Sequence, residues 1–175
     1  HIIAGQGTVG LEIAEQALEM RLPPDQVLIN CGGGGLSAGS AVALKARLQD
    51  VSVRTVEPED FDDTARSIAA GKRMMVAPGS RSICDSLLAD SPGELPFAIH
   101  RQLFDDGLTV SDREVRGAMR FAFQNLKMVV EPGGAVSLAA VLSGRIETAD
   151  RTTAIVISGG NVDLDEFAAI QASTD

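Results

Sequence analysis

Four consecutive glycines, Gly32, Gly33, Gly34 and Gly35, separate two segments of different character. Residues 26–30 before them form an apolar run typical of a strand buried on both faces, and residues 36–48 after them predict an alanine-rich helix. Glycines in such a loop let successive backbone N–H groups turn toward one point, and the helix adds the positive end of its dipole. This glycine loop is therefore predicted to bind a phosphate; the alternative is a flexible turn that only allows close packing.

The order of strand, turn and helix recurs along the chain. We expect further strands at residues 1–4, 51–56 and 153–157, and further helices at residues 9–20, 63–70, 111–127 and 135–142. Ser111 and Glu114 have the spacing of a capping box at a helix start. The 175 residues therefore fit one α/β domain, a parallel sheet with helices on both faces, in which ligands bind beyond the carboxyl ends of the strands.

The charge balance narrows the choice of partners. A net charge of −9, with only 15 Lys and Arg residues, argues against nucleic acid and against an anionic membrane surface. A small molecule is the expected partner. Two cysteines are too few for a disulfide framework, which favours a cytoplasmic location, and Cys84 is expected to be a small buried thiol.

Two glycine patterns also match a dinucleotide fingerprint. One is Gly33-x-Gly35-x-x-Ala38, with Glu57 placed where an acid that binds ribose belongs. The other, Gly5-x-Gly7-x-x-Gly10, has no acid after its next strand. An NAD(P)-binding dehydrogenase of the Rossmann type is therefore an alternative function.

Five short motifs occur in an order that resembles the second half of fold-type II pyridoxal-phosphate (PLP) enzymes. They are Gly-Gln-Gly-Thr from residue 5, the glycine loop, Glu-Pro from residue 57, Glu-Pro-Gly-Gly-Ala from residue 131 and Ser-Gly-Gly-Asn from residue 158. The resemblance is greatest to serine/threonine dehydratases (threonine ammonia-lyases) and serine racemases. It implies PLP as the cofactor and a hydroxyamino acid, such as L-threonine or L-serine, as the substrate of a dehydratase or a racemase.

The resemblance also implies roles for individual residues. The four glycines with the backbone of Leu36 would hold the cofactor phosphate, and Ser158 would bond the pyridine nitrogen, with Gly159 letting the backbone pass close to the ring. Glu131 would be the catalytic carboxylate near the cofactor's polar edge or the substrate. The alternatives are a strand-end turn residue for Ser158 and a helix-entry carboxylate for Glu131.

An acidic segment follows the third expected strand. Oxygen ligands suit Mg²⁺ or Ca²⁺, and the family resemblance implies Glu57, the carbonyl of Phe61 and Asp63 as a divalent metal site. The alternative is a solvated acidic turn.

The chain departs from the family at several points. The family's Schiff-base lysine lies in a Ser-x-Lys-x-Arg-Gly-Ala motif, and Lys45, Lys72 and Lys127 are all outside such a motif. Ser86 stands where the family usually has glycine, and His100 is expected to be a surface residue.

The missing motif affects the expected domain organisation. We expect residues 1–175 to be the C-terminal part of the PLP-binding large domain, without the lysine-bearing N-terminal half and the small domain. Such a chain is predicted to be inactive alone and to form a homo-oligomer or to pair with that half. A further alternative is a non-catalytic regulatory or binding half.

Overall fold

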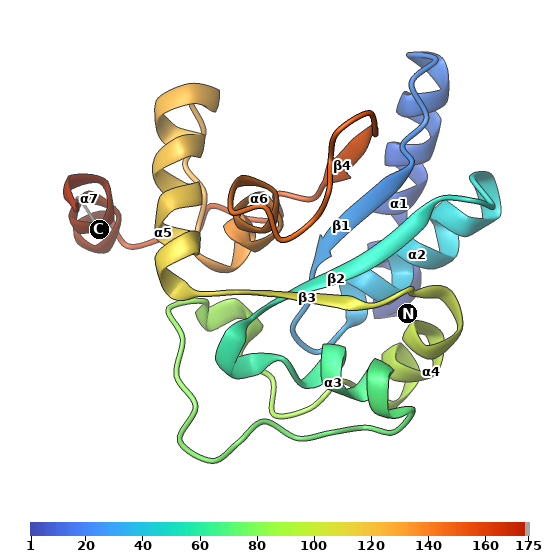
Figure 1. The fold of residues 1–175 in the computed structure, drawn as a ribbon, viewed down its shortest axis with the longest axis horizontal. Helices are drawn as coiled ribbons and strands as arrows, with labels where there is room; N and C mark the ends of the chain where they lie inside the picture. Colours follow the sequence, from blue (N-terminus) through green and yellow to red (C-terminus); the bar gives the residue numbers. More distant parts are fainter. Residues whose placement is uncertain (174–175) are drawn as a thin grey trace.

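The computed structural model describes residues 1–173, in which four parallel strands form one sheet (Figure 1). The strands are β1 (Gln26–Asn30), β2 (Ser52–Pro58), β3 (Gly107–Val110) and β4 (Thr153–Ile155), in the spatial order β3-β2-β1-β4. In the register, Gln26 of β1 lies opposite Ser52 of β2 and Thr153 of β4. The predicted α/β class with a parallel sheet is confirmed.

The helices connect and cover these strands. They are α1 (Ile2–Glu19), α2 (Gly35–Arg47), α3 (Asp63–Ala70), α4 (Glu94–Leu103), α5 (Asp112–Phe121), α6 (Val136–Leu142) and α7 (Leu164–Ala172). Short 3-10 turns occur at η1 (Glu59–Phe61), η2 (Asp85–Leu87) and η4 (Gly133–Ala135), and a π-helical turn, η3 (Ala122–Leu126), extends α5.

The central strand β1 is buried along its whole length and separates two apolar clusters. Val27 and Ile29 pack with residues of α1 and α2, whereas Leu28 packs with residues of α5 and α6. Alternate residues of a strand point to opposite faces, so helices cover both faces of the sheet. Figure 1 shows α1 and α2 on one side and α5, α6 and α7 on the other.

The expected strand at residues 1–4 is wrong, because these residues begin α1. Gly5 and Gly7 indicated a turn before the expected helix at residues 9–20, since each glycine weakens a helix interior. The structure instead uses Gly7 and Gly10 for close helix packing: a Cβ on Gly10 would lie 2.2 Å from the Ser40 carbonyl oxygen of α2, and one on Gly7 would lie 3.0 Å from that of Gly39. Tertiary contact therefore outweighs local propensity, and the fingerprint that begins at Gly5 lies inside a helix.

The other expected elements are confirmed with small shifts of their ends, while β3, α4 and α7 were not among the expected elements. The capping box is formed: the Ser111 hydroxyl accepts from the Glu114 N–H at 3.3 Å, and a Glu114 carboxylate oxygen accepts from the Ser111 N–H at 2.7 Å.

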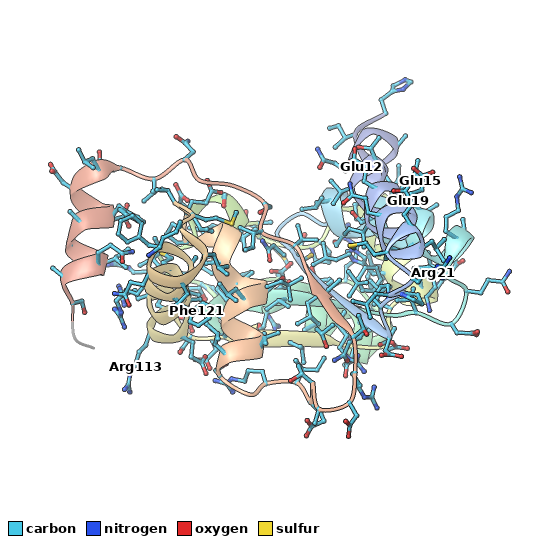
Figure 2. All side chains as sticks on the ribbon, turned by 90° about the horizontal axis from the view of Figure 1, so that it is seen from above. Glu12, Glu15, Glu19, Arg21, Arg113 and Phe121 are labelled. Carbon is cyan, nitrogen blue, oxygen red and sulfur yellow. The ribbon has the colours of Figure 1, made fainter. Side chains whose placement is uncertain are left out.

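The surface agrees with the acidic composition. Glu12, Glu15 and Glu19 are exposed along α1, on the side of the molecule opposite Arg113 of α5 (Figure 2). Within residues 1–173, no helix combines the length and the apolar character needed to cross a membrane.

Candidate functional site

A cavity of about 300 Å³ lies beyond the carboxyl ends of β1 and β4. It is lined by the glycine loop and by eight other residues: Ile2, Gln6, Asn30, Leu36, Ser86, Leu87, Glu131 and Ser158. The structure thus brings together the predicted phosphate loop, the predicted ring contact and the predicted catalytic carboxylate. This is the edge of a parallel sheet where ligands are expected.

The glycine loop needs glycine at one position and leaves room at another. Gly34 has a φ of +88°, and a Cβ there would lie 2.7 Å from His100 Cε1 and 2.7 Å from Pro96 Cβ. Gly33 is exposed, and a Cβ built on it meets nothing within 4 Å. The loop is packed on its inner side and open on its outer side, so an anion can approach its amides and the N-terminus of α2.

Ser158 is held by a buried amide side chain. Asn30 Nδ2 donates to Ser158 Oγ at 3.0 Å and to the Gly134 carbonyl at 3.1 Å, while Asn30 Oδ1 accepts from the Ser137 N–H at 3.1 Å. Because Ser158 Oγ accepts this bond, its own proton remains free to be donated to a ring nitrogen. Asn30 was missed by sequence reasoning; the available signal was a polar residue at the end of a fully buried strand.

Glu131 is fixed at the wall of the cavity. One carboxylate oxygen accepts from the Ser86 hydroxyl at 3.0 Å and the other from the Asn161 N–H at 2.9 Å. A Cβ on Gly159 would lie 2.8 Å from Glu131 Cδ, so glycine is needed there for the carboxylate to fit. This arrangement supports the site interpretation of Glu131 over that of a helix-entry carboxylate alone.

The predicted metal residues lie outside the lining of this cavity, around the start of α3. The buried Glu57 carboxylate accepts from the Thr64 N–H at 2.9 Å and the Ala65 N–H at 2.7 Å, and Asp63 Oδ2 is buried with no hydrogen-bond partner among the described residues. Burial raises the pKa of Glu57 to about 8 and that of Asp63 to about 6.

A divalent cation fits this region chemically. It would neutralise two poorly solvated carboxyl groups and give the unpaired oxygen of Asp63 a ligand. No three His, Cys, Asp or Glu side chains gather into a metal-holding group in residues 1–173, so a cation here would also need the Phe61 carbonyl and water.

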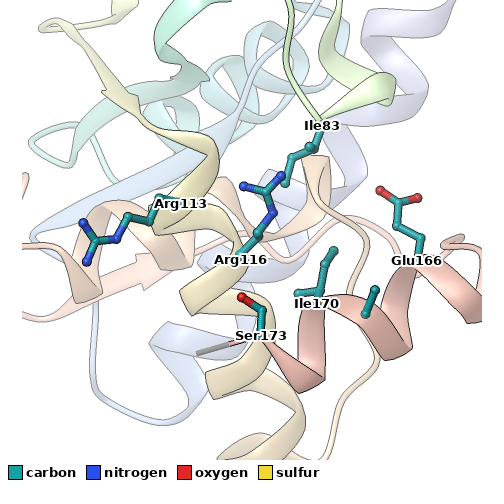
Figure 3. A pocket seen from close by; sticks show the side chains of 7 residues that line it. Ile83, Arg113, Arg116, Glu166, Ile170 and Ser173 are labelled. Carbon is teal, nitrogen blue, oxygen red and sulfur yellow. The ribbon is translucent and has the colours of Figure 1, made fainter. Parts of the chain in front are cut away.

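A larger cavity of about 740 Å³ lies between α5 and α7 (Figure 3). Its lining consists of Ile83, Arg113, Arg116, Glu166, Ala169, Ile170 and Ser173. It contains none of the residues predicted to contact the cofactor, so size alone does not identify the functional site.

His100 is buried, and its expected surface position is wrong. The side chain is 0% exposed, its Nε2 lies 2.8 Å from Ser37 Oγ, and its ring meets the edge of Phe104 at a centroid distance of 4.6 Å. Polar neighbours in sequence suggested a solvated face, but α4 turns His100 toward the back of the glycine loop. Burial lowers the pKa of His100 to about 4.

We expect His100 to contribute to loss of stability in acid. Its pKa is about 4 in the fold and near its ordinary value of 6.5 in the unfolded chain, so the unfolded state binds more protons between these values. The contribution of neutral His100 to the free energy of unfolding is fully present above about pH 6.5 and is lost as the pH falls through about 4. The total loss is limited to about 3 kcal/mol. Denaturant unfolding of the wild type and of His100→Gln over this range measures it. Parallel pH dependences of the two proteins would contradict this expectation.

The remaining nucleophile candidates are not activated. Burial raises the pKa of Cys31 and of Cys84 to about 12, so both thiols stay protonated near neutral pH, as expected for Cys84. Among the described residues no lysine lines the glycine-loop cavity, and the exposed Lys127 donates to the Gln124 carbonyl at 2.7 Å.

The comparisons with known proteins agree with this geometry. A family model described as "Pyridoxal-phosphate dependent enzyme" matches residues 1–159. The serine racemase of Arabidopsis thaliana is 40% identical over 168 residues, which are 93% of this chain and 49% of that protein. The catabolic L-threonine dehydratase TdcB of Escherichia coli (strain K12) is 38% identical over 176 residues, covering 99% of this chain and 52% of that protein. The crystal structure of a threonine deaminase from T.th. superposes with a TM-score of 0.86 at 45% identity, covering 92% of this chain and 58% of that one.

These matches decide between PLP and NAD(P) as the cofactor of this family. The chain spans about half the length of the curated relatives it matches. The dehydrogenase alternative gains no support, and the carboxylate expected to bind ribose, that of Glu57, instead caps α3 from a buried position. The family model, the five ordered motifs and the cavity at the glycine loop all point the same way: the chain belongs to the pyridoxal-phosphate dependent enzyme family.

Proposed function

We propose that the complete enzyme is a PLP-dependent dehydratase (ammonia-lyase) or racemase that acts on a hydroxyamino acid such as L-threonine or L-serine. The observation that carries this proposal is the cavity in which the glycine loop, Ser158 and Glu131 meet. The names of the relatives, a serine racemase and an L-threonine dehydratase, support the substrate class.

The residues present fit PLP. The amides of residues 32–36 and the N-terminus of α2 would hold the phosphate. Ser158 would donate to the pyridine nitrogen. Gly159 has no side chain, so the backbone there could lie close to the ring. When bound, PLP supplies an electron sink for the electron pair left by removal of the substrate α-proton.

The residues of this chain also favour certain reactions. A serine hydroxyl cannot protonate the pyridine nitrogen as a carboxylic acid would, so the ring would be a moderate electron sink. A moderate sink suits elimination and racemisation better than transamination. The Glu131 carboxylate, held by Ser86 and the Asn161 N–H, would hold a proton at the polar edge of the cavity.

Ser158→Ala should slow the complete enzyme without unfolding it. The change removes one hydrogen bond to the cofactor ring and one acceptor for Asn30. We expect the turnover rate to fall about tenfold or more, the cost of one hydrogen bond to a buried group. Steady-state assays measure the effect, with Ser143→Ala as control, because the Ser143 hydroxyl donates to the Ala139 carbonyl of the neighbouring helical turn, away from the cavity. Full turnover in Ser158→Ala would contradict the ring contact.

We further propose that a polypeptide region equivalent to the other half of the relatives supplies the Schiff-base lysine and the small domain. The absence of lysine from the cavity lining formed by residues 1–173 supports this, as does an apolar groove of about 550 Å³ between α1 and α2, where Ile3, Leu11 and Val42 contribute. Burying such a groove is favourable.

One assembly experiment tests the proposed function. The chain is co-produced with a polypeptide that corresponds to the N-terminal half of a relative, and the complex is supplied with PLP. Release of ammonia and keto acid from L-threonine identifies a dehydratase, and D-serine from L-serine identifies a racemase. A folded, PLP-loaded complex that yields neither product contradicts the proposal.

We propose Mg²⁺ or Ca²⁺ at Glu57, the Phe61 carbonyl and Asp63. A cation that binds only the folded state raises its stability by mass action, by about 2.7 kcal/mol at a hundredfold excess over Kd. The melting temperature should therefore climb with metal concentration, and Glu57→Gln should abolish the climb. Asp60→Asn, an exposed neighbour, is the matched control. A melting temperature indifferent to metal and chelator would contradict the site.

The oligomeric state and the cellular location can be proposed from the chain's exposed apolar surface and its thiols. Phe121, Phe123, Leu126, Met128 and Val129 expose apolar surface at the end of α5, which supports a homo-oligomer. Cys31 and Cys84 are both free, which supports a reducing, cytoplasmic location.

A further inference from the structure

We propose that His100 is a positioning residue that orients the amide groups of the glycine loop through Ser37. The inference rests on the proposed function, because the glycine loop is its phosphate site. His100 lies on α4 behind the loop, packs against Gly34 and is not itself among the residues that line the cavity. Its effect on a bound phosphate would therefore be indirect.

A chain of hydrogen bonds connects His100 to the loop backbone. His100 Nε2 lies 2.8 Å from Ser37 Oγ, and Ser37 Oγ lies 3.2 Å from the Gly34 carbonyl oxygen. A hydroxyl has one proton, so when Ser37 donates it to Gly34 it must accept from His100. Cys31 Sγ, at 3.4 Å, is a weaker acceptor for the same hydroxyl proton than the Gly34 carbonyl oxygen. The inference therefore requires the neutral imidazole that carries its proton on Nε2.

The direction of the Gly34 carbonyl sets the direction of the next amide. The peptide bonds of the described residues are all trans, and in a trans unit the carbonyl and the following N–H point in opposite directions. Bonds from Ser37 and from the Ala38 N–H, at 3.0 Å, hold the Gly34 carbonyl on the helix side. The Gly35 N–H is thereby aimed away from the helix interior, toward the open side of the loop.

The preceding peptide unit is held by the N-cap residue of α4. The Gly93 N–H, just before α4, donates to the Gly33 carbonyl at 3.1 Å, which aims the Gly34 N–H in the opposite direction. The segment from Gly93 to His100 thus fixes two successive carbonyls of the loop. Two successive amides are left for an anion.

The burial of His100 argues for a role beyond packing. Its Nδ1 is buried with no hydrogen-bond partner in the part of the chain that the structure describes. Leaving a buried polar atom unpaired is unfavourable, and a leucine would fill much of this space without that cost. What leucine lacks is the N–H that reaches Ser37.

Amide NMR of the ¹⁵N-labelled 175-residue chain, titrated with inorganic phosphate, tests the inference. In the wild type, the amides of Gly34, Gly35 and Leu36 should shift with phosphate. His100→Leu keeps the apolar packing but removes the donor, and should raise the phosphate Kd about tenfold, the effect expected of one lost hydrogen bond. His100→Gln places an N–H near the position of Nε2 and should restore the Kd to within about threefold of the wild type.

Ser37→Ala breaks the same connection from the other end, and it answers the question if His100→Leu does not fold. It should weaken phosphate binding by a similar factor, and His100→Leu should add little to it. An unchanged Kd in either folded variant overturns the inference, as does a His100→Gln variant no better than His100→Leu. Absence of amide shifts in the wild type would overturn both this inference and the phosphate site of the proposed function. Amide shifts in the wild type together with an unchanged phosphate Kd in the variants would overturn this inference but not the phosphate site.

Discussion

Gly33→Val should nearly abolish binding of PLP while the chain stays folded. A Cβ on Gly33 meets nothing within 4 Å and its φ lies outside the left-handed region, so the fold tolerates a side chain. That side chain would stand on the exposed side of the loop, where the phosphate must approach. We expect the Kd for PLP to rise about a hundredfold or more, or about 2.7 kcal/mol, and the melting temperature to change by only a few degrees.

Titration of the apoenzyme assembled with its N-terminal half measures this effect. Gly117→Val is the matched control, because a Cβ on Gly117 also meets nothing within 4 Å and the residue lies on α5, away from the loop. Gly34→Val would be uninformative about binding, since its φ of +88° and its contact with His100 would disturb the loop itself. Unchanged affinity in Gly33→Val would remove the glycine loop from the cofactor site.

The second large effect is the absence of a covalent link between PLP and the isolated chain. In the described part of the chain no lysine lines the glycine-loop cavity: Lys45 is on α2, Lys72 follows α3 and Lys127 ends η3. PLP would be held by its phosphate and ring contacts alone. One wall of the cavity would be open to water, so the site would not exclude solvent as removal of the substrate α-proton requires. We expect weak binding, no stoichiometric lysine modification after borohydride reduction and no ammonia from L-serine or L-threonine.

Mass spectrometry of the reduced, digested chain locates any modified lysine while keto-acid formation is assayed in parallel. The assembled complex is the positive control, in which one lysine of the N-terminal half should be modified. Stoichiometric modification of one lysine of this chain, together with turnover, would contradict the proposed division of the active site and would require a different layout.

The parts of the fold that depend on local pattern could be predicted. The continuous apolar strand β1 and the glycines after it indicate a strand, a loop and a helix from residues that are adjacent in sequence. Ser111 and Glu114 likewise fix the start of α5 through contacts three residues apart. The roles proposed for Ser158 and Glu131 were predicted from the order of the motifs, which no local rule supplies.

The parts that depend on distant contacts could not be predicted. Gly5 and Gly7 indicate turn residues until α2 is placed against Gly7, and β3 is an edge strand of only four residues with one fully buried position. His100 lies between polar neighbours in sequence, and only the packing of α4 behind the glycine loop shows that it is buried. The role of Asn30 depends on Ser158, which is 128 residues away.

A crystal structure of the chain with PLP bound tests the central claim most directly. We predict the phosphate within hydrogen-bonding distance of amides of residues 32–36, the pyridine nitrogen against Ser158 Oγ, and Glu131 still held by Ser86. Phosphate density elsewhere, for example beside Arg113 and Arg116 in the cavity between α5 and α7, with the glycine loop left empty, would contradict it.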